Sequence, residues 1–271
     1  MDRGVALVTG ASGDGIGRHA ASALRAAGFR VWAGARRAEA LEKLQQEGLE
    51  AVRLDLTDDA SLVGAVAKVG CVDVLVNNAA YGLLGPIEGL DLEEFRREME
   101  TNLFGLVRLT QLVLPGMREA SAGRIVNVGS IGGRVTTPLG GAYHASKFAL
   151  EAITDALRLE TRGFGVRVSI IEPGIVSTGF MDKATEALEV SSESPYAGMV
   201  SAYRPVLQRA YAGGYGAIPP ERVARAIVHA ATARHPRTRY RSGLQAKALN
   251  LLRHLTPDEL WDAAQSRLLR P

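Results

Sequence analysis

The sequence is poor in the residues that build disulfides and metal centres. Among 271 residues there is one cysteine, Cys71, which excludes an internal disulfide and any zinc site built from several thiolates. Because Cys71 precedes an apolar run, we predict a buried structural thiol. The histidines show no ligand spacing, so we expect no metal site and assign structural or solvated roles to all five: His19, His144, His229, His235 and His254.

The chain also has little net charge and no long hydrophobic run. Its formal charge of +3 gives no overall signal for binding nucleic acid. Residues 221–271 hold ten Lys or Arg and four Asp or Glu, and a solvated basic surface is the simpler interpretation of this excess. No apolar stretch approaches membrane-spanning length, and the first apolar run is too short for a secretory signal. We therefore expect a cytoplasmic protein without stable membrane insertion.

What the sequence does have is a regular alternation of strand-like and helix-like segments. Short apolar runs predict strands at 5–9, 30–35, 51–54, 72–76, 124–128 and 166–171. Helical periodicity appears at 17–27, 38–47, 61–69, 92–117, 143–161 and 221–233. Gly105 and the Leu-Pro-Gly at 114–116 are expected to interrupt or end the 92–117 helix. The alternation predicts an α/β fold: a single doubly wound Rossmann-type domain over residues 1–271, with a mostly parallel sheet.

The last third of the chain departs from this alternation. Residues 178–220 have weak periodicity and several Met, Phe and Tyr residues, which is typical of an apolar lid over a hydrophobic ligand. Packing against the domain explains these side chains equally well. Residues 221–271 form a C-terminal helical extension with an extended piece at 239–241. Intramolecular packing is expected for its large apolar residues, with an interface, a pocket wall or a membrane surface as alternatives: Leu249, Leu252, Leu255, Trp261, Leu268 and Leu269.

A glycine-rich turn joins the first predicted strand to the first predicted helix. It reads Thr-Gly-Ala-Ser-Gly-Asp-Gly-Ile-Gly over residues 9–17, and its glycines permit positive φ and close approach to a pyrophosphate. The following helix offers free N–H groups and its positive dipole end to the same anion. This context predicts a dinucleotide site, whose candidate contacts in the turn are Gly10, Ser12, Asp14, Gly15, Ile16 and Gly17.

The residues after the second predicted strand indicate which dinucleotide binds. A site for NAD(H) would carry an Asp or Glu there for the ribose hydroxyls, whereas this chain has Arg36 and Arg37. A guanidinium can hold a 2′-phosphate through paired hydrogen bonds, so we predict NADP(H) over NAD(H). Asp14 opposes this preference, since a carboxylate would repel that phosphate. A plain surface pair of arginines is the alternative.

Tyr143 and Lys147 are the candidates for acid–base chemistry. Four residues apart at the start of a predicted helix, they lie on one face, one turn from each other. A free tyrosine titrates at about pH 10, and a nearby ammonium is expected to lower the pKa of the phenol. Tyr143 could then exchange a proton with a carbonyl or alcohol oxygen. Ser130 follows the predicted strand at 124–128 and could hold that oxygen.

Together these residues resemble the short-chain dehydrogenase/reductase family, over nearly the whole chain. The glycine turn resembles the family's glycine motif, although it is one residue longer around residues 12–14. Residues 77–80, Asn-Asn-Ala-Ala, resemble its Asn-Asn-Ala-Gly motif, with Ala80 in place of glycine. Asn102, Ser130, Tyr143 and Lys147 match its catalytic tetrad. Further matches to its cofactor-binding segments are Asp55, Leu56, Asn78, Ala79, Pro173, Gly174, Val176 and Thr178.

The resemblance implies an oxidoreductase that moves a hydride between a nicotinamide and a carbonyl/alcohol pair without a metal. It further implies that Tyr143 and Lys147 contact the cofactor, with Lys147 on the nicotinamide ribose. Asn102 would interrupt its helix to hold a water, Asn78 would lie near the cofactor ribose, and Thr178 would bond the carboxamide. Asp55 would contact the adenine ring.

Segments 143–151 and 171–174 look most like the branch of hydroxysteroid and retinol dehydrogenases, and many bacterial carbonyl reductases share them. A hydrophobic ketone, aldehyde, steroid or retinoid-like substrate is therefore expected.

The family forms dimers or tetramers through two long helices, here around 92–117 and 144–161, which implies a homodimer or homotetramer. A catalytically silent dinucleotide-binding sensor is the alternative function, although such proteins typically lose the Tyr or Lys that this chain keeps. Epimerisation or dehydration through a retained cofactor is a third possibility.

Overall fold

A parallel seven-stranded sheet forms the centre of the molecule. The computed structural model describes residues 3–180, 184–185, 188–214 and 216–268; Leu269, the side chain of Leu268 and parts of the predicted lid lie outside these residues. The strand order is β3-β2-β1-β4-β5-β6-β7, and every pairing of these strands is parallel, so the predicted mostly parallel sheet is confirmed. The strands are β1 (Val5–Val8), β2 (Arg30–Ala35), β3 (Glu50–Arg53), β4 (Val74–Asn77), β5 (Gly123–Val128), β6 (Val166–Pro173) and β7 (Arg239–Ser242).

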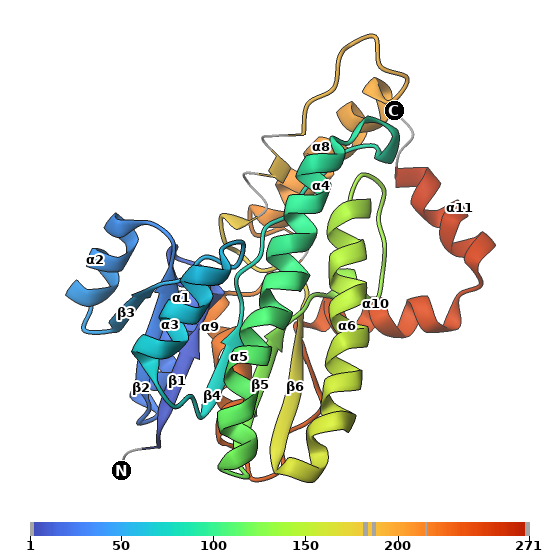
Figure 1. Ribbon diagram of the computed structural model, residues 1–271. Helices are drawn as coiled ribbons and strands as arrows, with labels where there is room; N and C mark the ends of the chain where they lie inside the picture. Colours follow the sequence, from blue (N-terminus) through green and yellow to red (C-terminus); the bar gives the residue numbers. More distant parts are fainter. Residues whose placement is uncertain (1–2, 181–183, 186–187, 215, 269–271) are drawn as a thin grey trace.

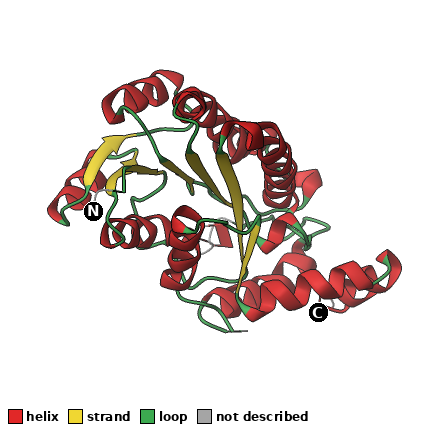
Figure 2. Ribbon diagram, turned by 90° about the horizontal axis from the view of Figure 1, so that it is seen from below, coloured by secondary structure: helices red, strands yellow, loops and turns green. Residues whose placement is uncertain are grey.

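Helices cover both faces of this sheet (Figures 1 and 2). The α-helices are α1 (Ile16–Ala26), α2 (Ala38–Gln46), α3 (Asp59–Val69), α4 (Leu92–Met99), α5 (Gly105–Glu119), α6 (Gly141–Thr161), α8 (Ala197–Tyr211), α9 (Pro220–Thr232), α10 (Leu244–Leu255) and α11 (Asp258–Leu268). Shorter turns of helix are η1 (Ile87–Gly89), η3 (Ile131–Gly133), η4 (Arg162–Phe164) and the π-helical η2 (Glu100–Phe104). No described helix is long and apolar enough to cross a membrane.

The sheet is apolar on both sides because each face packs against a layer of helices. In β1, Ala6 and Val8 lie in one core cluster with α1, α2 and α9, while Leu7 lies in another with α3 and α5. Successive side chains of a strand point to opposite faces, so a strand covered on both faces needs a continuous apolar run. This explains why periodicity predicted the strands as short apolar segments.

The strand order reverses its direction between β1 and β4. From β1 the chain winds outward to β2 and β3, and from β4 it winds the other way to β5, β6 and β7. At such a reversal the loops after the two central strands diverge, and ligands of parallel α/β sheets bind there. The glycine turn follows β1, and Asn78 and Ala79 follow β4, so both predicted cofactor segments lie at this point.

Two local predictions are wrong. Cys71 is exposed, because it lies in the surface turn between α3 and β4 rather than in the strand. The Leu-Pro-Gly at 114–116 does not end the long helix, since α5 continues to Glu119 with Pro115 inside it. Pro115 removes one backbone hydrogen bond, but Val113 and Met117 are buried on either side and hold the helix on the sheet.

The C-terminal extension also differs from its prediction. Leu249, Leu252 and Leu255 of α10 are 37%, 54% and 70% exposed, so their packing within the chain is incomplete. Trp261 of α11 is buried as expected, and the Arg253 guanidinium lies 5.6 Å from the centre of its ring. Figure 1 shows α10 leading away from the sheet edge, past α6, with α11 beyond it, which agrees with the exposed face of α10.

Candidate active site

Thr9 joins the loops that follow β1 and β4. This fully buried residue accepts hydrogen bonds at Oγ1 from the backbone N–H groups of Asn78 and Ala79, both at 2.9 Å. The side-chain amide of Asn78 in turn donates hydrogen bonds to the Thr9 and Gly10 carbonyls, at 2.9 and 3.2 Å. The loop after β4 is thus fastened to the glycine turn. Sequence reasoning assigned no role to Thr9, although a threonine directly after a buried strand was a usable signal.

The glycines of the turn divide into two kinds. Gly10 has φ +70°, and a Cβ there would lie 2.6 Å from Ala79 Cα; a Cβ on Gly17 would overlap the Asn78 amide. At Gly13 and Gly15, by contrast, a Cβ would meet nothing within 4 Å. The first pair is needed for the fold, whereas the second leaves open space before the start of α1.

The start of α1 is suited to an anion. Gly15 is its N-cap, no side chain caps it, and its first turn carries no acidic residue. The free N–H groups and the positive dipole end therefore face the space left by Gly13 and Gly15. The residues present fit the pyrophosphate of a dinucleotide. Ser12 and Asp14 are exposed on the same turn, and Ile16 is partly buried behind it.

Arg36 and Arg37 lie between β2 and α2, next to this turn in the sheet order. Both are exposed, and no ion pair joins either guanidinium to another described residue. Asp55, after β3, accepts hydrogen bonds from the Thr57 backbone and hydroxyl at 3.1 and 2.9 Å, so its carboxylate closes its own turn. Leu56 is buried and packs against Gly105 at the start of α5.

Ser130, Tyr143 and Lys147 come together at the carboxyl end of β5. Lys147 is 4% exposed, donates to the Val128 carbonyl at 3.1 Å, and places Nζ 5.8 Å from the centre of the Tyr143 ring. Ser130 begins η3 and accepts a hydrogen bond from the Gly132 N–H at 3.0 Å. It also hydrogen-bonds to Tyr143.

Asn102 joins this group from the opposite helix. It lies in the π-turn η2, where the long helix is locally widened between α4 and α5. Its amide pairs with the Tyr81 backbone, accepting from the N–H at 3.0 Å and donating to the carbonyl at 2.8 Å. The amide nitrogen also lies 3.1 Å from the Ser146 hydroxyl on α6. All four residues predicted as a tetrad are therefore brought together.

Burial dominates the electrostatics of this group. It raises the pKa of Tyr143 to about 12, although the hydrogen bond with Ser130 lowers it. Burial also lowers the pKa of Lys147 to about 8. The expectation that the ammonium lowers the phenol pKa is therefore wrong for the protein alone, because loss of solvation has the larger effect. At neutral pH the phenol is protonated and able to donate.

His144 supports the loop that carries Ser130. Its Nε2 accepts from the Thr137 N–H at 3.2 Å, which requires Nδ1 to carry the proton that it donates to the Gly132 carbonyl at 2.9 Å. Burial lowers the pKa of this imidazole. A neutral His144 therefore joins η3 to α6, in the structural role predicted from sequence.

The segment after β6 lies over Tyr143. Pro173 ends the strand, Gly174 bonds to Ser242, and the buried Val176 pairs with Ile218. The backbone N–H of Thr178 donates a hydrogen bond to the Val176 carbonyl at 2.9 Å. The ring centres of Phe180 and Tyr143 lie 5.9 Å apart. Beyond it, α8 forms a small core with the 139 loop and buries Leu139, Leu188, Val200 and Tyr203. Much of the predicted lid thus packs on itself, while Phe180 faces the phenol.

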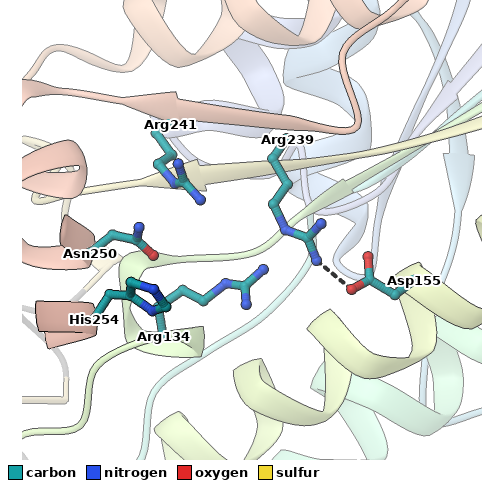
Figure 3. Close-up of a pocket in the computed structure, with 6 residues that line it drawn as sticks. All are labelled: Arg134, Asp155, Arg239, Arg241, Asn250 and His254. Atoms are coloured by element: carbon teal, nitrogen blue, oxygen red, sulfur yellow. Dashed lines mark hydrogen bonds and ion pairs between the residues drawn. The ribbon is translucent and has the colours of Figure 1, made fainter.

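A second polar cluster lies between α6, β7 and α10. A hollow of about 430 Å³ is lined by Arg134, Asp155, Arg239, Arg241, Asn250 and His254 (Figure 3). The buried carboxylates Glu151 and Glu172 form ion pairs with the three arginines of this lining. The guanidiniums are already paired with carboxylates of the chain, so we interpret the cluster as structural.

The fold and the site define an oxidoreductase. The chain belongs to the short-chain dehydrogenase family: the family model described as short chain dehydrogenase matches residues 4–189. The chain is 35% identical to the uncharacterized oxidoreductase YbbO of Escherichia coli K12, over 94% of this chain and 91% of that protein. It is 34% identical to human retinol dehydrogenase 5, over 97% and 88%. A Burkholderia cenocepacia short chain dehydrogenase solved in complex with NADP superposes with TM-score 0.75 at 27% identity, over 98% of both chains.

Proposed function

We propose that the protein is an NADP(H)-dependent oxidoreductase that interconverts a carbonyl and a secondary alcohol on a hydrophobic substrate. The observation that carries the proposal is the partly buried phenol of Tyr143, hydrogen-bonded to Ser130 and one helical turn from the Lys147 ammonium. A catalytically silent dinucleotide sensor would not require these three groups together.

Tyr143 is the proposed acid and base. When bound, the nicotinamide would supply or accept the hydride. In the reductive direction Ser130 would hold the carbonyl oxygen, and Tyr143 would give it a proton as negative charge develops there. The Lys147 ammonium would stabilise the phenolate left behind, and Asn102 would hold the water that returns a proton. A phenol pKa of about 12 keeps the donor protonated at neutral pH and so favours reduction.

Several features support NADP(H). The glycine turn and the start of α1 would hold the pyrophosphate, and Arg36 with Arg37 would hold the 2′-phosphate. The solved Burkholderia relative is itself a complex with NADP. Asp14 is exposed on the turn and can point into solvent, which reduces its repulsion of a phosphate.

The substrate side of the site supports an apolar ligand. Phe180 flanks the phenol, and Leu84, Met199 and Val206 pack against the small apolar core of α8. One relative is a retinol dehydrogenase, whose name indicates a long apolar alcohol. The proposed substrates are hydrophobic ketones or aldehydes, including steroid-like and retinoid-like ones.

The long helices support a homodimer or homotetramer. Several large apolar side chains of α4, η2 and α6 are exposed in the single chain: Leu92, Phe104, Phe148, Ile153 and Leu159. Exposed apolar residues gathered on two neighbouring helices are suited to an isologous contact with a second copy.

The first test follows NADPH absorbance with a panel of hydrophobic ketones, aldehydes, quinones and ketosteroids. We expect the wild type to oxidise NADPH faster than NADH. Tyr143→Phe should lower kcat by roughly 1,000-fold, because it removes the transferred proton, while NADPH still binds. Tyr240→Phe is the matched control, since Tyr240 is a buried, hydrogen-bonded tyrosine on β7. Full activity in Tyr143→Phe would overturn the mechanism; tight NADPH binding without turnover of any substrate would favour the sensor.

A further inference from the structure

Glu98 is a buried carboxylate that the proposed mechanism does not use. It lies on α4 one turn before Asn102, and its side chain is completely shielded from solvent. Its neighbours Arg96 and Arg97 point outward and pair with Glu93 and Glu94. Among the ion pairs of the described residues, none involves Glu98. A buried carboxylate without a guanidinium partner is costly and needs a reason.

The contacts of Glu98 lead directly to the tetrad. Its Oε1 accepts from the Leu83 N–H at 3.2 Å and from the Asn102 amide at 3.3 Å, while Oε2 is buried without a hydrogen-bond partner. The same Asn102 nitrogen lies 3.1 Å from Ser146 Oγ, which donates to the Tyr143 carbonyl at 2.8 Å. A continuous chain of polar contacts therefore runs from Glu98 to the helix of Tyr143 and Lys147.

Glu98 is also the negative charge that acts on this desolvated site. Its charge raises the pKa of Lys147, opposing the effect of burial, and raises the pKa of Tyr143. Burial raises the pKa of Glu98 itself to about 7. The groups that face it are Lys147 and Tyr143 on α6 and Tyr81 in the loop after β4. Around Tyr81 lie also the charges of Glu94, Arg97 and Arg36.

We propose that Glu98 is a positioning residue of the active site: its carboxylate fixes the Asn102 amide and supplies the buried charge that keeps the Lys147 ammonium protonated. This inference rests on the proposed function for its catalytic meaning, but the ionisation of Lys147 can be measured without turnover. A merely structural Glu98 would anchor the Leu83 turn and leave Lys147 unaffected. The isosteric variant Glu98→Gln separates the two roles, because it keeps an acceptor oxygen and removes the charge.

The test is an NMR titration of Lys147 in the full-length protein. The chain has only five lysines, so labelling at lysine Cε gives few signals, and Lys147→Arg identifies the one of interest. We expect Glu98→Gln to lower the Lys147 pKa by about one unit or more. Glu94→Gln, one turn earlier on α4 with a side chain that is 41% exposed and paired with Arg97, is the matched control and should leave it unchanged. Equal Lys147 pKa values in wild type and Glu98→Gln would overturn the proposal.

Two further readouts keep the test decisive. If Glu98→Gln does not fold, the wild-type Lys147 signal must still show a second titration step near pH 7 from Glu98, and its absence overturns the proposal. In turnover, the alkaline limb of the reductive pH profile should move to lower pH in Glu98→Gln and not in Glu94→Gln. An unmoved limb overturns the catalytic meaning, while a wild type that reduces no carbonyl overturns the proposed function and leaves the titration intact.

Discussion

The protein buries carboxylates in two places, with different partners. Glu151 and Glu172 form ion pairs with the three arginines that line the hollow shown in Figure 3. Glu98 lies beside the tetrad, where it accepts hydrogen bonds from a backbone N–H and a side-chain amide. Burial raises the pKa of both Glu98 and Glu151 to about 7, but for Glu151 the neighbouring Glu172 adds repulsion.

The presence or absence of arginine partners determines the role of each buried carboxylate. In the arginine cluster the opposite charges nearly balance within the chain, and the ion pairs join α6, β6 and β7 to the loop after η3. Glu98 has no guanidinium partner among the ion pairs of the described residues, and its charge acts on the ammonium of Lys147. The first arrangement stabilises the fold, whereas the second sets the protonation of the site at some expense of stability.

Arg239→Gln is expected to have the largest effect on this comparison. The Arg239 guanidinium lies 3.1 Å from Glu151, 2.6 Å from Asp155 and 3.2 Å from Glu172. Its loss leaves buried carboxylates under-compensated, and breaking such a pair costs roughly 3–5 kcal/mol. Urea unfolding at pH 8 should therefore show a fall of about 3 kcal/mol in the free energy of unfolding.

Arg158→Gln is the matched control for this change. Arg158 also contacts Asp155, at 2.6 Å, but through a partly exposed pair within one helix. Its loss should change stability by less than about 0.5 kcal/mol. Equal losses in the two variants would show that burial does not distinguish the pairs, and the structural role of the cluster would be wrong.

Glu98→Gln is expected to have an intermediate effect of the opposite sign. The folded-state pKa of Glu98, about 7, lies above that of an exposed glutamate, so the stability it contributes at low pH is lost as pH rises through 7. Glutamine does not ionise, so the variant does not lose this stability as pH rises. The variant should gain on the order of 2 kcal/mol relative to wild type between pH 5 and pH 8. Parallel stability curves for the two proteins would contradict a desolvated, titrating Glu98.

Sequence patterns predicted most of the fold because burial on both sheet faces leaves a simple signature. The 30–35 strand agrees in both bounds, and the 92–117 helix in its extent within two residues. Cys71 and the Leu-Pro-Gly at 114–116 were wrong because a turn and tertiary packing overrode local propensity. The tetrad residues were named from motifs, and the structure places them together; their roles stay predictions.

Glu98 could not have been found this way. It stands in Glu-Glu-Phe-Arg-Arg-Glu-Met-Glu, a charge run that is typical of a solvated helix face. Only the packing of α4 against α6 shows that one of these carboxylates points inward. The same holds for Arg239 and Glu151, which are 88 positions apart in sequence and meet only when β7 joins the sheet.

Glu151→Gln is expected to have the smallest effect. Oε2 of Glu151 receives Arg134 and Arg239, while Oε1 is buried without a partner, so glutamine keeps the paired oxygen. The lost attraction to arginine is offset by lost repulsion from Glu172. Because the Glu151 pKa is about 7, its carboxyl is already neutral at low pH, and any difference from wild type should appear only as pH rises through 7. Urea unfolding at pH 5 and pH 8 should show a change below about 1 kcal/mol in the free energy of unfolding.

A loss of stability as large as that of Arg239→Gln would contradict this prediction. It would mean that the arginines depend on the charge of Glu151 as well as on that of Glu172. The contrast with Glu98 would then rest on the location of the carboxylates alone.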